Sequence, residues 1–328
     1  MAGYSKEATD LLEQALDIRG RLFGAGSLAA AYNKTLLVPY LLLQGRALEA
    51  DRLSKQALDA AAEAFGDDSP NLAAFLRERA SVSVALGHMQ AGEVLLRRAL
   101  RLQEAALPAD SPLIVPTLTA LADNLVIQRR AQEAQPLASR ALKITEAWTG
   151  SNGPGVVGPL ESMANVLAAE GKSSEALNAG RRALDVAAKV YGAHHPATAG
   201  AMRIVGNSLA RFQVSYGDAK SFLEAAIAID KAMPTPLNFW LAADLNNLAL
   251  VEEADRDLAQ AREHLHSSLA IFDRAGFVDS LSMAVALINL ARVDTALNLK
   301  VEADSATALA VRIFEKSDAD ITDRDRAL

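Results

Sequence analysis

One segment has the glycine spacing of a dinucleotide-binding loop. Gly153, Gly155 and Gly158 reproduce the pattern GxGxxG, in which glycines let the backbone approach a pyrophosphate at the start of a helix. That chemistry requires a β-strand directly before the first glycine, and no strand precedes Gly153. The segment also lies in register with the turns between repeats described below. We therefore expect it to be a turn, and we expect the protein to hold no cofactor.

The histidines and the absence of cysteine bear on metal and covalent chemistry. His194 and His195 are adjacent, and His264 and His266 are two residues apart. The first pair lies in a short turn and the second would point to different sides of a helix, so neither predicts a metal site. The sequence has no cysteine, which excludes disulfides, thiolate nucleophiles and thiolate metal ligands. No HExxH, P-loop or serine–histidine–aspartate set stands out, so we expect no catalytic residues and no enzyme.

The composition favours a helical protein. Of the 328 residues, 51% are hydrophobic but only 5% are aromatic. A core rich in alanine and poor in rings suits close packing of helices, whereas sandwiches and propellers favour aromatic and β-branched residues. The fold class is therefore expected to be all-α.

The charge is mildly acidic, with a formal net charge of −7 and a pI near 5.4. Nucleic acids and anionic membranes attract clustered positive charge, so we expect neither as a partner. The first ten residues lack the apolar stretch of a secretory signal, and no run reaches the roughly 18 apolar residues of a membrane span. We expect a cytoplasmic protein.

The sequence repeats itself about every 42 residues. An acidic or polar residue, a small residue, six variable residues and Ala-Leu or a near equivalent recur eight times. The small residue of this pattern occurs at Ala8, Ala50, Gly92, Ala134, Ala176, Ala219, Ala261 and Ala303. One step is 43 residues long, which predicts an inserted residue and a local irregularity around Gln213 to Gly217. Such a period indicates stacked units rather than independent domains.

Turn residues divide each repeat in two. Prolines that follow a short polar segment recur every 42 residues, at Pro70, Pro112, Pro154 and Pro196. Glycine suits the end of one helix and proline the first turn of the next. A second turn is predicted midway by glycines five residues before the small residue, namely Gly45, Gly87 and Gly171. Each unit is expected to contain helix A, a turn, helix B and a polar connector.

These signals predict a single solenoid over residues 1–317. A leading helix over 5–22 is followed by seven helix pairs, at 28–65, 70–107, 112–149, 154–191, 196–233, 237–275 and 279–317. A helix pair cannot bury both faces alone, so neighbouring units must stack. The apolar pattern ends at Ser317, and we expect residues 318–328 to form a frayed polar tail.

The unit resembles the tetratricopeptide repeat. The segments Tyr191-Gly192-Ala193-His194-His195-Pro196 and Leu245-Asn246-Asn247-Leu248-Ala249 are similar to the connector and helix of the extended repeats in kinesin light chains and many bacterial tetratricopeptide proteins. The resemblance covers nearly the whole chain, although the repeats from residue 232 onward lose the Gly-x-x-His-Pro connector. It implies a right-handed α-solenoid of stacked antiparallel helix pairs. HEAT repeats have a similar period, but the alanine-rich positions and the aromatic-glycine connector favour the tetratricopeptide interpretation.

In this family, helix A of each unit lines a concave groove that holds a peptide or a partner helix. One residue after the central small residue of helix A lie Ser81, Asp123, Asn165, Asn207, Leu250 and Arg292. Three residues before it lie Arg77, Thr119, Glu161, Arg203, Asn246 and Ile288. The two rows are four residues apart and share a helical face, so the resemblance implies a mostly polar ladder along the groove.

We interpret part of this ladder as a partner-binding surface, the alternative being a merely solvated helix face. Asn offers a donor and an acceptor, and Arg offers a fork for carboxylates. We expect a partner's backbone and acidic groups to bind at Arg77, Ser81, Asp123, Asn165, Arg203, Asn207, Asn246, Asn247, Asn289 and Arg292. The expected function is a protein-interaction scaffold or adaptor for a protein or peptide ligand. The alternative function is a regulatory or sensor fragment of a larger bacterial protein with a protease, kinase or DNA-binding domain.

Overall fold

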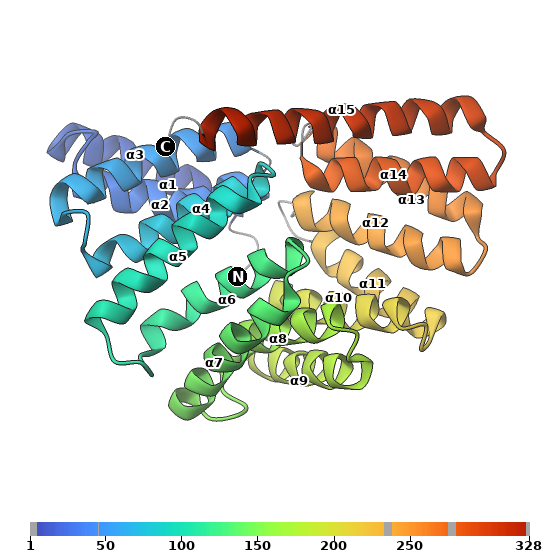
Figure 1. The fold of residues 1–328 in the computed structure, drawn as a ribbon, viewed down its shortest axis with the longest axis horizontal. Helices are drawn as coiled ribbons and strands as arrows, with labels where there is room; N and C mark the ends of the chain where they lie inside the picture. The colour runs from blue at the N-terminus through green and yellow to red at the C-terminus, as the bar shows by residue number, and fades with distance from the viewer. Residues whose placement is uncertain (1–4, 45, 233–237, 275–279, 326–328) are drawn as a thin grey trace.

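The computed structural model describes residues 5–44, 46–232, 238–274 and 280–325 (Figure 1). Within these ranges the chain forms fifteen α-helices and three short 3-10 helices, and no strand. No helix in the described part of the chain is both long and apolar enough to cross a membrane. The predicted all-α fold class is confirmed.

The helices follow one another as a leading helix and seven antiparallel pairs. The leading helix is α1, Ser5–Phe23. Helix A of the successive units is α2 Leu28–Leu43, α4 Ala73–Ala85, α6 Val115–Ile127, α8 Val157–Ala169, α10 Pro196–Arg211, α12 Asn238–Ala254 and α14 Leu281–Ala296. Helix B is α3 Ala47–Phe65, α5 Met89–Ala106, α7 Ala131–Thr149, α9 Ser173–Tyr191, α11 Tyr216–Lys231, α13 Leu258–Arg274 and α15 Lys300–Asp325. The 3-10 helices η1 Pro70–Leu72, η2 Pro112–Ile114 and η3 Pro154–Val156 precede α4, α6 and α8.

The connectors between units stop one helix and start the next. Gly66 ends α3 with a backbone φ of +80°, a conformation that costs glycine little and other residues more. Ser69 then accepts a hydrogen bond from the Asn71 amide, and Pro70 occupies the first turn, where its missing N–H is harmless. The same sequence of caps recurs at Ser111 and Pro112.

The turn between helix A and helix B contains a residue with positive φ in the six units from α4 onward, where all residues of this turn are described. Gly87 and Gly171 occupy this position in two units, and Arg129, Gln213, Arg256 and Asn298 occupy it in four others. The inserted residue follows Gln213, because residues 212–215 separate α10 from α11 whereas residues 170–172 separate α8 from α9. The predicted irregularity is confirmed at this turn.

Small residues let the two helices of a unit approach closely. Ala134 and Ala176 on helix B are fully buried. Opposite the helix B residue Ala219 lies Gly206 on α10, where an added Cβ would come within 3.2 Å of the Ala219 carbonyl oxygen and 3.0 Å of Leu223 Cγ. The stack is therefore held by backbone proximity as well as by aliphatic side chains.

The stack curves until its last units face its first. Figure 1 shows α12 to α15 returning towards α2 and α3, and α12 contacts α2 directly. One hydrophobic cluster joins the two ends, since Leu42 of α2 and Ala47 of α3 pack with Ala242 of α12 and Leu287 of α14. The inner faces of helix A from both ends consequently enclose a common space.

At the C-terminal end, helix α15 continues to Asp325. It therefore includes residues 318–325 of the segment 318–328 that is expected to form a frayed polar tail. Residues 318–325 are mostly polar, but none of them is Gly or Pro, so nothing in this segment interrupts the helix. The expected boundaries at residues 233, 237, 275 and 279, and the turn at Gly45, lie outside the described residues.

Candidate partner-binding groove

The main recess of the described structure lies between the first and last units. It has a volume of about 780 Å³ and is lined by α2, α4 and α6 from one end of the stack and by α12 and α14 from the other, with two residues from α5 and one from α13. We call this recess the inner groove. Such a volume is in the range that holds a small molecule or a few side chains of a bound segment.

The wall of the inner groove is mostly apolar. Its apolar residues include Pro39, Leu42, Leu43, Val84, Ala85, Ile127, Trp240, Leu281 and Val285. Val285 and Trp240 are each more than two-fifths exposed, which is unusual for residues facing inward. The groove thus presents apolar surface that a bound segment would remove from water.

Ionisable groups interrupt this apolar wall. Arg77 and Glu78 of α4 and Asp123 of α6 all line the groove. Burial raises the pKa of Asp123 to about 6, although the nearby Ser162 hydroxyl partly offsets this, and Oδ1 of Asp123 has no hydrogen-bond partner within the described residues. Burial also raises the pKa of Glu78, against the opposing effect of Arg77, whose Nη2 lies 3.8 Å from a Glu78 oxygen. The groove therefore holds two carboxyl groups and a single guanidinium.

A further carboxyl lies beside Asp123 on the next helix A. Burial raises the pKa of Glu161 on α8 to about 7, the Arg203 guanidinium lowers it in part, and the like charge of Asp123 raises it further. Positive charge is therefore insufficient at this end of the groove to keep both carboxyl groups fully ionised at neutral pH.

Half of the predicted ladder lines the inner groove. The groove-lining residues are Arg77, Ser81, Asp123, Asn246 and Asn247. The other five, which are absent from its lining, are Asn165, Arg203, Asn207, Asn289 and Arg292. Asn165, Arg203 and Asn207 lie on α8 and α10, which the curvature of the stack leaves beyond the lining. Asn289 and Arg292 lie on α14, which does line the groove, but their side chains pair with α12.

Arg203 is engaged within the chain. Its Nη2 lies 3.1 Å from Asp230 of α11, its Nε donates to Asp244 of α12, and its guanidinium lies 4.9 Å from the Trp240 ring centroid. Arg203 is only 12% exposed and both aspartates are buried. The expectation that Arg203 binds a partner's acidic group is thus unsupported, because this guanidinium already neutralises two buried carboxyl groups.

Two other predicted residues also have partners within the chain. Asn289 is buried and donates to Asn246 Oδ1 at 2.8 Å, joining α14 to α12. Arg292 forms a two-pronged contact with Glu253, with Nε 2.6 Å from one oxygen and Nη2 donating to the other. Both pairs connect helix A of unit 7 to helix A of unit 6.

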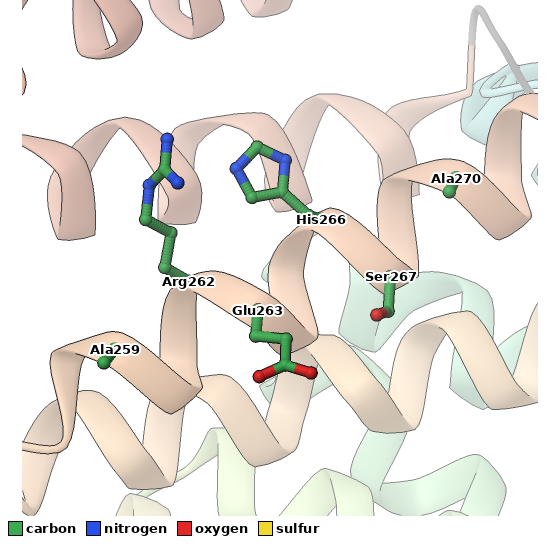
Figure 2. A pocket seen from close by; sticks show the side chains of 6 residues that line it. All are labelled: Ala259, Arg262, Glu263, His266, Ser267 and Ala270. Carbon is green, nitrogen blue, oxygen red and sulfur yellow. The ribbon is translucent and has the colours of Figure 1, made fainter.

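A second depression, of about 460 Å³, lies on the outer side of α13 (Figure 2). All its lining residues come from this one helix, and Figure 2 shows Arg262 and His266 projecting to one side and Glu263 to the other. His264 belongs to a different contact, because its Nδ1 lies 2.7 Å from Glu252 of α12. No set of groups converges here, so the inner groove is the better candidate site.

The remaining motifs of the sequence have structural roles. The glycine-rich segment at 153–158 follows α7 rather than a strand and forms η3 and the start of α8. His195 caps α10, since its Nδ1 accepts a hydrogen bond from the Ala197 amide, and its ring stacks on Tyr191 at 4.9 Å. The residues of the aromatic-Gly-x-x-His-Pro connector therefore have structural roles here: the histidine caps the next helix, and the aromatic residue stacks on the histidine ring.

Sequence reasoning missed the apolar part of the groove. Pro39, Leu42 and Leu43 lie near the end of α2, and Leu281 and Val285 lie at the start of α14. No periodic signal distinguishes these residues from core residues, since both read as apolar positions on helix A. Their exposure depends on how far the solenoid curves.

Comparison with known proteins identifies the repeat type. A family model described as tetratricopeptide repeat matches residues 158–232. None of the curated proteins matches the chain.

Solved structures share the fold at low sequence identity. A Rap protein complexed with competence and sporulation factor has a TM-score of 0.65 and 13% identity, over 97% of this chain and 95% of that one. BtubC (BKLC) from P. vanneervenii has a TM-score of 0.52 and 17% identity, over 72% of this chain and 92% of that one. The apo form of RapI has a TM-score of 0.50 and 13% identity, over 74% and 98% respectively. The chain is thus an α-solenoid of stacked helix pairs with the fold of these structures, and its residues 158–232 match the tetratricopeptide-repeat model.

Proposed function

We propose that this protein is a non-enzymatic interaction scaffold that holds a segment of a partner protein in the inner groove. The observation that carries this proposal is the groove itself, an apolar recess enclosed by helix A from both ends of the solenoid. Tetratricopeptide folds generally mediate protein–protein interactions, and the Rap structure of similar fold is a complex with competence and sporulation factor.

The chemistry of the wall favours a segment with apolar side chains and one cationic side chain. Apolar groups would cover Leu43, Ile127 and Val285 and gain about 25 cal/mol for each Å² of apolar surface removed from water. A lysine or arginine would lie beside Asp123, whose side chain lines the groove, and would be held by a charge-assisted hydrogen bond to its carboxylate. Asn247, which makes no side-chain hydrogen bond within the described residues, would bind the backbone of the segment.

This preference differs from the expectation of an acidic partner. Arg203 and Arg292 are occupied by Asp230, Asp244 and Glu253. The carboxyl groups of Asp123 and Glu78, by contrast, have pKa values raised by burial and gain from an added positive charge.

An unbiased selection tests the proposal. Random peptides of about twelve residues are displayed and selected on the purified chain, and the best binders are titrated against variants. We expect Asp123→Asn to weaken binding at least about tenfold, since a charged hydrogen bond contributes about 1.5–3 kcal/mol and 1.4 kcal/mol is tenfold. Val285→Trp should block the groove, and both variants should keep the helical circular dichroism of the parent chain.

Asn165→Ala and Asn207→Ala are the matched controls, because both residues occupy ladder positions that do not line the groove. They should leave the affinity unchanged. Failure to enrich any peptide, or binders equally tight to Asp123→Asn and Val285→Trp, would contradict the proposal. Loss of binding in the two asparagine variants alone would place the site further along α8 and α10.

A further inference from the structure

Helix α1 occupies the position of helix B in a unit whose helix A is not present among the described residues. The register places Ala8 and Ala15 of α1 where Ala50 and Ala57 lie in α3. On one side α1 packs against α2, as each later helix B packs against the following helix A, and Leu12 and Leu16 join the cluster of Leu37, Val38 and Leu41. A hydrogen bond also joins α1 to α2 on this side, since Asn33 Nδ2 of α2 donates to the Leu12 carbonyl oxygen at 3.0 Å.

The opposite side of α1 is open. We call it the α1 flank and define it by Leu11 and Ile18, which are seven residues apart and therefore share a helical face. Leu11 is 58% exposed, whereas its leucine counterparts in later helices are buried, at Leu53, or half-buried, at Leu95 and Leu137. Ile18 is 49% exposed, whereas its counterparts are buried in most later helices, for example Ile144 at 5% and Val186 at 4%, and half-buried in the others, at Leu102 and Ile271.

The counterparts show what normally covers this position. Val186 packs with Val157 and Leu160 of α8, and Ile229 packs with Ala199 of α10, so in each unit the residue faces its own helix A. The α1 flank is thus the half of an interface that the chain forms seven times elsewhere. Its large apolar residues are those of a buried helix B, not those of a polar capping helix, which repeat arrays normally place at their ends.

We propose that the α1 flank binds an amphipathic helix of a partner protein, which packs antiparallel to α1 in the place of helix A. The best-matched internal helix indicates the chemistry of this partner. Helix α7 carries the same residue types as α1 at five flank and core positions, Ala134, Leu137, Ala141, Leu142 and Ile144, against Ala8, Leu11, Ala15, Leu16 and Ile18. A helix that resembles α6, the helix A of α7, therefore has the apolar stripe that the α1 flank accepts. This interface is separate from the inner groove, so its test is independent of the proposed function.

A graft tests the α1 flank within the intact solenoid. Residues 112–130, which comprise η2, α6 and the following turn, are fused directly before Ser5 in place of residues 1–4. The register then matches that of unit 3, because Ala131 and Ser5 are equivalent positions. We expect Tm to rise by at least about 2 °C and amide exchange in α1 to slow at least about tenfold.

Ile18→Asp is the matched variant. It should leave the parent chain's Tm nearly unchanged, because Ile18 is already half exposed, but it should remove most of the gain conferred by the graft. A graft that leaves Tm and α1 exchange unchanged, or that stabilises the Ile18→Asp chain equally, would overturn the proposal.

Binding in trans gives a second readout. A fluorescein-labelled peptide of residues 112–127 should bind the unmodified chain saturably and bind the Ile18→Asp chain at least about tenfold more weakly. The unmodified chain alone should sediment as a monomer over the concentrations used. A dimer that Ile18→Asp dissociates would overturn the proposal, because the α1 flank would then be covered by a second copy of the chain.

Discussion

The buried cluster around Arg203 provides a sharp test of how the solenoid is held together. Arg203→Met keeps most of the side-chain volume but leaves Asp230 and Asp244 buried without a cation. Breaking a buried ion pair on one side typically costs about 3–5 kcal/mol, because the remaining charge is uncompensated. Loss of the guanidinium over the Trp240 ring adds to this cost. We expect the free energy of unfolding to fall by about 3 kcal/mol or more at pH 7.5.

The pH dependence has a definite sign. Burial raises the pKa of Asp230 to about 6, and that of Asp244 is also raised, both against the opposing effect of Arg203. A carboxyl whose pKa is higher in the folded state than in the unfolded chain binds more protons when folded, so its contribution to stability is fully present below about pH 4 and is lost as pH rises through about 6. Removing Arg203 raises both pKa values further. The deficit of Arg203→Met should therefore be largest above pH 7 and should shrink as pH falls below 6.

Urea denaturation followed by circular dichroism measures the deficit, and amide exchange in α10 and α12 measures it locally, since repeat arrays can unfold in parts. The triple variant Arg203→Met, Asp230→Asn, Asp244→Asn should recover much of the loss, because no buried charge remains. A deficit below about 1 kcal/mol at pH 7.5, or one that grows on acidification, would refute the assignment of Arg203 to structure and would return it to the candidate ligand-binding residues.

Two further predictions concern packing and pairing. Gly206→Ala should destabilise the chain by about 1–3 kcal/mol, because its Cβ would press on Leu223 and the Ala219 carbonyl. Gly158→Ala on α8 is the control and should stabilise the chain by about 0.5–1 kcal/mol, because a Cβ there meets nothing within 4 Å. Equal effects of the two substitutions in thermal melts would disprove the close approach of α10 and α11. Arg292→Ala should lower the free energy of unfolding by at most about 1 kcal/mol, since Arg292 is half exposed despite its contact with Glu253. A larger loss in urea titrations would contradict this and would show that the pair contributes substantially to the packing of α14 on α12.

The fold could be predicted because the same pattern of small, apolar and turn residues recurs in most units of the chain. The small residues at 42-residue steps, the prolines after each connector and the single long step all correspond to features of the helices, including the extra residue after Gln213. The length of the last helix could not be predicted from the end of the apolar pattern, because residues 318–325 are mostly polar but contain no Gly or Pro that would end a helix.

The site could be predicted only in part. The register of the repeat shows which residues share the inner face of the helices. It correctly placed Asp123 and Asn246 among the residues that line the groove. It does not show curvature, which decides that α12 returns to α2 while α8 and α10 lie outside the lining. Nor does it show that Arg203 meets Asp230 and Asp244, which lie 27 and 41 residues away in sequence, on helix B of the same unit and helix A of the next.

The measurement that tests the central claim most directly is hydrogen–deuterium exchange of the whole chain with and without a saturating selected peptide. Binding in the inner groove predicts slower exchange in α4, α6, α12 and α14, with α7, α9 and the outer side of α13 unchanged. Slower exchange confined to the helix B layer, or to α8 and α10, would contradict the account.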